Sequence, residues 1–120
     1  MKDVEWKTYA FYGIFVDRSN RDACFRPNGW THVEDLEVEG FEANHDFGVA
    51  RVVHNPHDSV KLVVCQLSPS AEEVADSIEG IHRGFYYRSN AAAVFGDAWP
   101  EDSTTDPEST TVYMLNVRGA

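Results

Sequence analysis

The fold is decided by residues 48–67, which read GVARVVHNPHDSVKLVVCQL. The two ends of this stretch, 48–54 and 60–67, are dense in β-branched residues, which favour extended strands. The polar run between them contains Asn55-Pro56, a common turn signal. The pattern predicts a β-hairpin with its turn at 54–59. Because the second strand is apolar at both parities, we expect it to lie at the centre of a sheet and to be covered on both faces.

A helix start follows this stretch, with either Ser68 or Ser70 as the N-cap. We expect the helix to span about residues 69–83. Apolar residues recur at steps of four, three and four, and predict the face that packs on the sheet. The acidic residues fall on the remaining surface, toward solvent. The apolar positions are Val74, Ile78, Ile81 and Phe85, and the acidic ones are Glu72, Glu73, Asp76 and Glu79.

The rest of the chain completes an α+β pattern. We expect a single sheet, antiparallel or mixed, of about four to five strands, with the main helix packed on one face. Residues 84–96 fit either a strand or a helix, and we prefer a short second helix at about 90–95. The other expected segments are a long strand at 4–16, a loop at 17–30, a strand at 31–46, an acidic mobile loop at 97–109 and a strand at 110–117.

Length and composition limit the class of protein. The 120 residues fit a single compact domain spanning 1–120. Cys24 and Cys65 form no Cys-x-x-Cys pair, and the first residues lack the apolar core of a signal peptide, so we expect a cytoplasmic protein. No apolar run approaches the ~20 residues that cross a bilayer, so we expect no membrane partner. The sequence predicts no oligomeric state.

The charge balance favours one kind of partner. Twenty acidic residues stand against ten basic ones, giving a formal net charge of −10. Direct binding of nucleic acid is therefore not expected, because phosphates require a positive surface. A basic protein surface is the expected partner, although net negative charge also serves solubility alone.

The stretch Asp35-Leu36-Glu37-Val38-Glu39 alternates carboxylate and aliphatic side chains at the strand period. Carboxylates on one face of a strand stand about 6.6 Å apart, a spacing that resembles a row of phosphates. One interpretation is a binding face for a basic partner. The other is the solvent face of an edge strand, where charge discourages edge-to-edge pairing.

From this face we predict a small acidic binding protein, an inhibitor or adaptor that occupies the nucleic-acid-binding surface of a protein partner as a nucleic-acid mimic. Charge steers such an encounter, and aromatic residues stabilise the complex. The predicted partner-binding residues are Asp35, Glu37, Glu39, Glu42 and Trp99.

The alternative hypothesis is a protein that binds a small molecule or nucleotide derivative, or a minor enzyme. It would use the arginine-containing loop 18–26 and neighbouring aromatic residues, with Arg18, Arg21 and Arg26 as anion ligands. The sequence contains no nucleophile motif, phosphate-binding loop or dinucleotide fingerprint, so we predict no catalytic residue.

Two patterns approach metal sites without matching them. His54, His57 and Asp58 supply too few ligands for structural zinc. Residues 35–46 place acidic side chains at some positions of a calcium loop, but the last is Asp46 where such loops use a bidentate glutamate. We therefore predict no metal and no cofactor.

Overall fold

The structure is a computed structural model, and it describes residues 5–45 and 50–116. The strands are β1 (Lys7–Phe11), β2 (Trp30–Asn44), β3 (Arg51–Leu67), β4 (Tyr86–Asn90) and β5 (Thr110–Leu115). The helices are α1 (Arg18–Phe25), α2 (Pro69–Glu79) and α3 (Ala91–Phe95). Short 3-10 helices are η1 (Ile14–Val16), η3 (Ile81–Arg83), η4 (Gly96–Ala98) and η5 (Pro107–Ser109).

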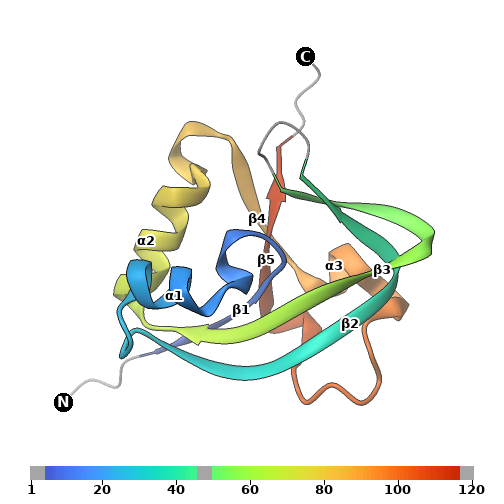
Figure 1. Cartoon of the computed structure of the whole chain (residues 1–120), viewed down its shortest axis with the longest axis horizontal. Coiled ribbons are helices and arrows are strands. Elements are labelled where there is room, and N and C mark those ends of the chain that lie inside the picture. Colours follow the sequence, from blue (N-terminus) through green and yellow to red (C-terminus); the bar gives the residue numbers. More distant parts are fainter. Residues whose placement is uncertain (1–4, 46–49, 117–120) are drawn as a thin grey trace.

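The strands form one sheet in the order β2-β3-β1-β5-β4 (Figure 1). Strand β1 lies at the centre, antiparallel to β3 and parallel to β5. The predicted α+β fold with a mixed sheet is confirmed. Strand β3 was predicted at the centre of the sheet, but it lies between the edge strand β2 and the central strand β1.

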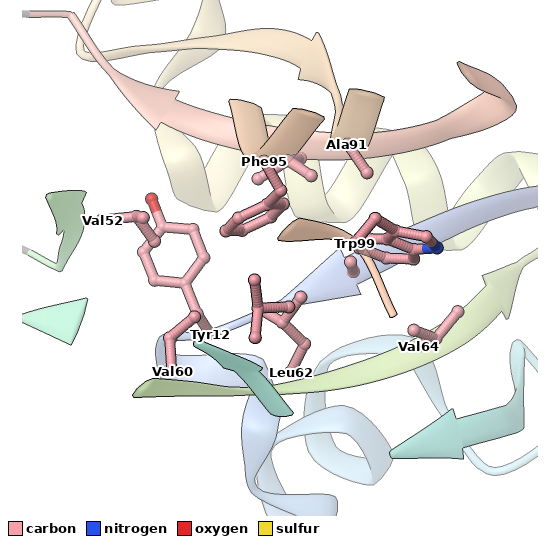
Figure 2. Close-up of a cluster of buried hydrophobic side chains, with 11 residues drawn as sticks. Tyr12, Val52, Val60, Leu62, Val64, Ala91, Phe95 and Trp99 are labelled. Atoms are coloured by element: carbon pink, nitrogen blue, oxygen red, sulfur yellow. The ribbon is translucent and has the colours of Figure 1, made fainter. Parts of the chain in front are cut away.

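Hydrophobic cores cover both faces of the sheet because successive strand residues point to opposite sides. Along β1, Tyr9 and Phe11 pack with α1 and α2, whereas Ala10 packs toward α3. Figure 2 shows the α3 side, where Phe95 of α3 lies between Tyr12 and Trp99. Fully buried residues of the two cores include Tyr9, Phe15, Val38, Leu62, Val64, Cys65, Leu67 and Val112.

The turn predicted at 54–59 is wrong. Strand β3 runs through this segment without reversing, and pairs with β2 in a long curved hairpin (Figure 1). Ser59 pairs with Glu39 and His54 with Phe41, so residues 55–58 stand opposite Gly40 alone. The polar run therefore interrupts the ladder as a bulge, while the pairing on both sides continues. Gly40 has a φ of +91°, which favours glycine. The predicted strand start, 48–49, lies outside the described residues.

The first predicted strand is too long, and the predicted loop 17–30 contains a helix. Strand β1 ends at Phe11, and η1 leads into α1. Polar, turn-forming residues gave no sustained helical period here. Phe25 at the end of α1 packs on Phe11 and Phe15, with ring centroids 6.2 and 4.6 Å away. Tertiary packing of this one aromatic residue stabilises a helix that local propensity does not predict.

The predicted helix start after β3 agrees with the structure. The Oγ of Ser68 accepts a hydrogen bond from the Ala71 N–H at 3.2 Å, and Pro69 occupies the first turn. Helix α2 ends at Glu79, because Gly80 takes the left-handed conformation with φ +68°. The predicted span of 69–83 thus divides into α2 and η3.

The predicted packing face of this helix is wrong. Ala71 and Ala75 are its buried residues, whereas Val74 and Ile78 are 36% and 43% exposed. The acidic residues that flank the alanines face the sheet, which presents polar groups there. Of the other two predicted apolar positions, Ile81 of η3 is half-buried against the core and Phe85 is 53% exposed.

The short second helix predicted at about 90–95 is confirmed as α3. Asn90 caps it by accepting the Ala93 N–H at 2.8 Å. Residues 86–90 form β4, so the ambiguous segment 84–96 contains both a strand and a helix.

Residues 97–109, the predicted acidic loop, contain parts of η4 and all of η5. Trp99 is only 8% exposed. Ser103 donates to the Glu34 carboxylate of β2 at 2.6 Å, and Thr105 also donates to it. Partial desolvation raises the pKa of Glu34, but these hydrogen bonds outweigh it and lower the pKa. The mobility of this loop stays a prediction. No helix within the described part of the chain is long and apolar enough to cross a membrane.

Replacing the α2 cap tests the origin of this helix. Ser68→Ala removes the acceptor for the Ala71 N–H and should lower the free energy of unfolding by about 1 kcal/mol. Thermal unfolding should show a Tm lower by about 3 to 6 °C. Ser77→Ala, at an exposed position of the same helix, is the control and should leave the Tm within about 1 °C. Equal Tm values for both variants would contradict the cap.

Candidate functional site

A cavity of about 420 Å³ lies where β1 ends, beside the C-terminal end of α2. Among the described residues of its wall, Glu79 supplies the carboxyl group, and the tyrosines come from β4, β5 and the residue that follows β1. The lining residues are Ala10, Phe11, Tyr12, Gly13, Ile14, Phe15, His45, Ala50, Ile78, Glu79, Tyr86 and Tyr113. The volume suits a small molecule.

One wall of the cavity is the chain between the end of β1 and η1. Gly13 lies so close to Ala50 that an added Cβ would stand 3.1 Å from the Ala50 Cβ. An alanine at this position would require its neighbour to shift by a few tenths of an ångström. The glycine therefore sets the close approach of this wall to the chain entering β3.

Side chains of α1 hold this wall from behind, at its carbonyl oxygens. Asn20 donates to the Ile14 carbonyl, and one guanidinium nitrogen of Arg21 donates to the Phe15 and Val16 carbonyls, each at 2.8 Å. Arg21 is only 5% exposed, and its guanidinium lies 4.4 Å from the Trp30 ring centroid. Because a planar peptide unit turns its N–H opposite to its C=O, the Phe15 and Val16 amides point away from α1.

Glu79 is the chemically notable group of the cavity. Its side chain is half-buried in the wall, and burial raises the pKa of its carboxyl to about 7. Desolvation raises the pKa of Tyr86, and the Glu79 carboxyl raises it further. A carboxyl with a pKa near neutrality can both accept and donate a proton at neutral pH.

The tyrosines around Glu79 are held by backbone carbonyls. The Tyr12 hydroxyl donates to the Tyr113 carbonyl at 2.6 Å, and the Tyr86 hydroxyl donates to the Ala50 carbonyl at 2.5 Å. Desolvation, as the largest cause, raises the pKa of both Tyr12 and Tyr86, so both stay protonated near neutral pH. Their rings form a fixed wall rather than a source of protons.

A polar network beneath α2 positions Glu79. The Tyr113 hydroxyl donates to Asp76 Oδ1 at 2.6 Å, and Arg88 donates to the same carboxylate, with its Nε 3.1 Å from Oδ1. One turn earlier, the Tyr9 hydroxyl donates to Glu72. Three strands therefore bind the acidic face of the helix. This face includes Glu79, one turn beyond Asp76, so the helix must present Glu79 toward the sheet and the cavity.

The predicted acidic face on β2 is present, but it does not line the cavity. Asp35, Glu37 and Glu39 are exposed on β2, an edge strand of the sheet. Two of these carboxylates contact side chains of the same protein. His32 Nε2 lies 2.8 Å from Asp35 Oδ1, and Ser59 donates to Glu37 at 2.5 Å. Charged side chains in this place suit an edge strand that must not pair with another chain.

The other two predicted partner-binding residues are separated from this row. Glu42 is half-buried, accepts from Asn55 Nδ2 at 3.2 Å, and lines a neighbouring hollow of about 370 Å³. Trp99 packs in the core with Phe95, with ring centroids 5.9 Å apart. The structure does not gather the five predicted residues into one surface.

The predicted anion ligands all belong to α1 or its C-terminal cap, and none lines the cavity. Arg18 lies 3.7 Å from Asp22, Arg21 binds the η1 carbonyls, and Arg26 is exposed with a φ of +65°. Among the described residues, no group of three histidine, cysteine or acidic side chains is placed to hold a metal. Asp46 of the calcium-like pattern lies outside the described residues.

Glu79 was not predicted as a site residue, because all acidic residues of the helix were expected on the solvent side. A signal was present: Asp76 and Glu79 share a face with Ala71 and Ala75, the small residues that allow close packing. The tyrosines of the strands at 7–11 and 110–115 could have been expected to bind that acidic face.

Comparisons with known proteins identify the fold. The chain superimposes on a solved structure described as a gamma-glutamyl cyclotransferase, with a TM-score of 0.64 and 15% identity over 92% of this chain and 67% of the other. An uncharacterised protein from Homo sapiens gives a TM-score of 0.63 and 17% identity over the same shares. No family model matches the chain, and no curated protein matches it in sequence. At these identities the likeness concerns the fold.

The predicted function is therefore wrong. The predicted acidic inhibitor and nucleic-acid mimic is contradicted because the chain shares its fold with a solved structure described as a gamma-glutamyl cyclotransferase. The alternative hypothesis, a small-molecule binder or enzyme, agrees better with the finding. The expected basic protein partner stays an untested prediction.

The contacts behind the cavity wall predict unequal effects of two neighbouring substitutions. Arg21→Ala leaves the Phe15 carbonyl, in a buried contact, and the Val16 carbonyl, in a partly buried one, without their charged donor, and should lower the free energy of unfolding by about 3 kcal/mol. Asn20→Ala removes a single hydrogen bond, which is exposed, and should lower the free energy of unfolding by about 1 kcal/mol. Urea unfolding of both variants measures the difference. Equal losses would show that the Arg21 contacts do not stabilise the wall.

The raised pKa of Glu79 predicts a pH-dependent gain in stability for Glu79→Gln. The folded state favours the protonated carboxyl, so its contribution is complete below the unfolded pKa of about 4.3 and is lost as pH rises through about 7. At pH 8 the variant should be more stable by about 1 to 3 kcal/mol, and at pH 4 the two proteins should be equal.

Urea unfolding at both pH values tests this prediction. Tyr12, Tyr86, Tyr113 and His45 also face the cavity and are the same in both proteins. Glu73→Gln, at an exposed position of α2, is the control and should show no such pH dependence. A Glu79→Gln variant that is no more stable at pH 8 would mean that the carboxyl is well solvated.

Proposed function

We propose that this chain is a small enzyme that uses Glu79 as a general base and then as a general acid on a molecule bound in the cavity. The observation that carries the proposal is the carboxyl of Glu79, held in a cavity wall with a pKa of about 7. Proton transfer is most effective when the pKa of the catalytic group lies near the working pH. Perturbed carboxyl groups in clefts often mark such sites.

The reaction class follows from the structural neighbour described as a gamma-glutamyl cyclotransferase. We propose that the substrate is a γ-glutamyl amide and that the reaction closes a ring. The substrate's α-amine attacks its own γ-carbonyl carbon, a new C–N bond forms, and the bond to the departing amine breaks. The products are a five-membered lactam, 5-oxoproline, and the free amine. No cofactor is required for this exchange of one amide bond for another.

Glu79 supplies the proton transfers that this ring closure needs. Its carboxylate accepts a proton from the attacking α-amine, and the resulting acid donates that proton to the nitrogen of the departing amine. The proton count balances, and Glu79 returns to its carboxylate form. The cavity holds the flexible glutamyl chain in a folded conformation, which lowers the entropic cost of ring closure.

The wall at η1 supports the proposal as a binding surface. The Phe15 N–H is turned away from α1, because the carbonyl on the opposite side of its peptide unit is held by Asn20. No lysine or arginine lines the cavity in the described part of the chain. Backbone amides of this wall are thus the available donors for the substrate's α-carboxylate. We also propose a cytoplasmic location, as the unpaired Cys24 and Cys65 favour.

The proposal predicts that Glu79→Gln abolishes ring closure. With γ-glutamyl-alanine as substrate and 5-oxoproline measured by chromatography, kcat/KM should fall by about 100-fold or more. In the unaltered protein, kcat/KM should rise with pH through a midpoint near 7, as Glu79 loses its proton. Because histidine also changes charge near neutral pH, His45→Asn is the control and should keep this midpoint.

Two outcomes would overturn the proposal. If Glu79→Gln retains more than about half of the activity, Glu79 is not the proton-transfer group. If the unaltered protein binds γ-glutamyl-alanine in calorimetry but releases no 5-oxoproline, the chain is a binding protein rather than an enzyme.

A further inference from the structure

Exposed apolar side chains gather at the opening of the cavity. Seven large hydrophobic residues in the described part of the chain are at least 36% exposed, and two of them line this cavity. Ile14, from η1, is 50% exposed, and Ile78, from α2, is 43% exposed. A residue that lines a cavity and is also half-exposed stands at its mouth. We call Ile14 and Ile78 the apolar rim.

The rim lies beside the proposed proton-transfer group. Ile78 directly precedes Glu79 on α2, and Ile14 directly follows Gly13 at the end of the opposite wall. The inner lining includes buried residues of β1, of β5 and of the position that follows β1: Ala10, Phe11, Tyr12 and Tyr113. The half of a substrate that closes into a ring must be enclosed, whereas the half that departs must reach solvent. The departing half therefore passes the rim.

The charge around the cavity is unfavourable for an anionic side chain on the departing group. The chain carries a formal net charge of −10, and among the described residues no lysine or arginine lines the cavity to offset it. An aliphatic side chain meets no such penalty and gains by covering two exposed isoleucines. The rim thus selects by apolar contact rather than by charge.

We propose that the departing amine carries a large aliphatic side chain, and that Ile14 and Ile78 determine this specificity by contacting it. The inference rests on the proposed function, and γ-glutamyl-leucine is its model substrate. One apolar group placed in such a site changes kcat/KM by about ten-fold or more. γ-Glutamyl-asparagine matches leucine closely in size and shape while replacing two methyl groups by an amide.

The experiment compares these two substrates in the full chain. The ratio of kcat/KM for γ-glutamyl-leucine over γ-glutamyl-asparagine should be at least about ten in the unaltered protein. Ile14→Thr and Ile78→Thr keep the branched shape, and each should lower this ratio by about three-fold or more. Val74→Thr is the matched control, because Val74 is exposed on the same helix but does not line the cavity. It should leave the ratio unchanged.

Binding separates this inference from the proposed function. Calorimetry of Glu79→Gln protein with both dipeptides should show tighter binding of γ-glutamyl-leucine, and Ile78→Thr in the same background should remove the preference. This measurement stands whether or not any dipeptide is turned over. If both dipeptides are turned over at equal kcat/KM, the specificity role of the rim is rejected while the proposed function stands. The rim is also overturned if calorimetry shows equal or absent binding of the two.

Discussion

The arrangement of this molecule depends on the hydrogen bonds between the acidic face of α2 and the strands beneath it. The Asp76 carboxylate accepts hydrogen bonds from the Tyr113 hydroxyl and the Arg88 guanidinium, and the Glu72 carboxylate accepts one from the Tyr9 hydroxyl. Burying carboxylates is unfavourable unless each finds a partner. Here the partners come from β1, β4 and β5, so the network orients the helix as well as stabilising it. An apolar contact, which lacks direction, would not fix the rotation of α2 about its axis.

The candidate site is a consequence of that rotation. Glu79 continues the bonded face by one turn, but beyond the network it reaches the cavity rather than a cationic partner. Its pKa is accordingly raised, while Asp76 is paired with Arg88. The opposite wall is fixed by a separate device, the donors of Asn20 and Arg21 on the carbonyls of residues 14–16. Two independent elements, α2 and α1, thus hold the two sides of one small cavity.

Local patterns in the sequence predicted elements better than faces. The Ser68 cap, α3 and the strand character of residues 31–44 and 60–67 follow from propensity and capping, and the structure contains them. The rotation of α2 about its axis could not be predicted from local patterns. Its tyrosine partners are distant in the sequence: Tyr113 is 37 residues from Asp76, and Tyr9 is 63 residues from Glu72. Helix α1 was missed for the same reason, since its stability comes from aromatic packing. Glu79 could be identified only once these distant contacts placed it in a cavity.

The bulge at residues 55–58 has a structural consequence of its own. Four residues of β3 there face only Gly40, and the pairing is regular on both sides of them, from Arg51 to His54 and from Ser59 to Val64. Length can change at such a point without shifting any pair elsewhere, because the excess is already excluded from the hydrogen bonding. The hairpin therefore contains a natural insertion point nearer to its turn than to its far end.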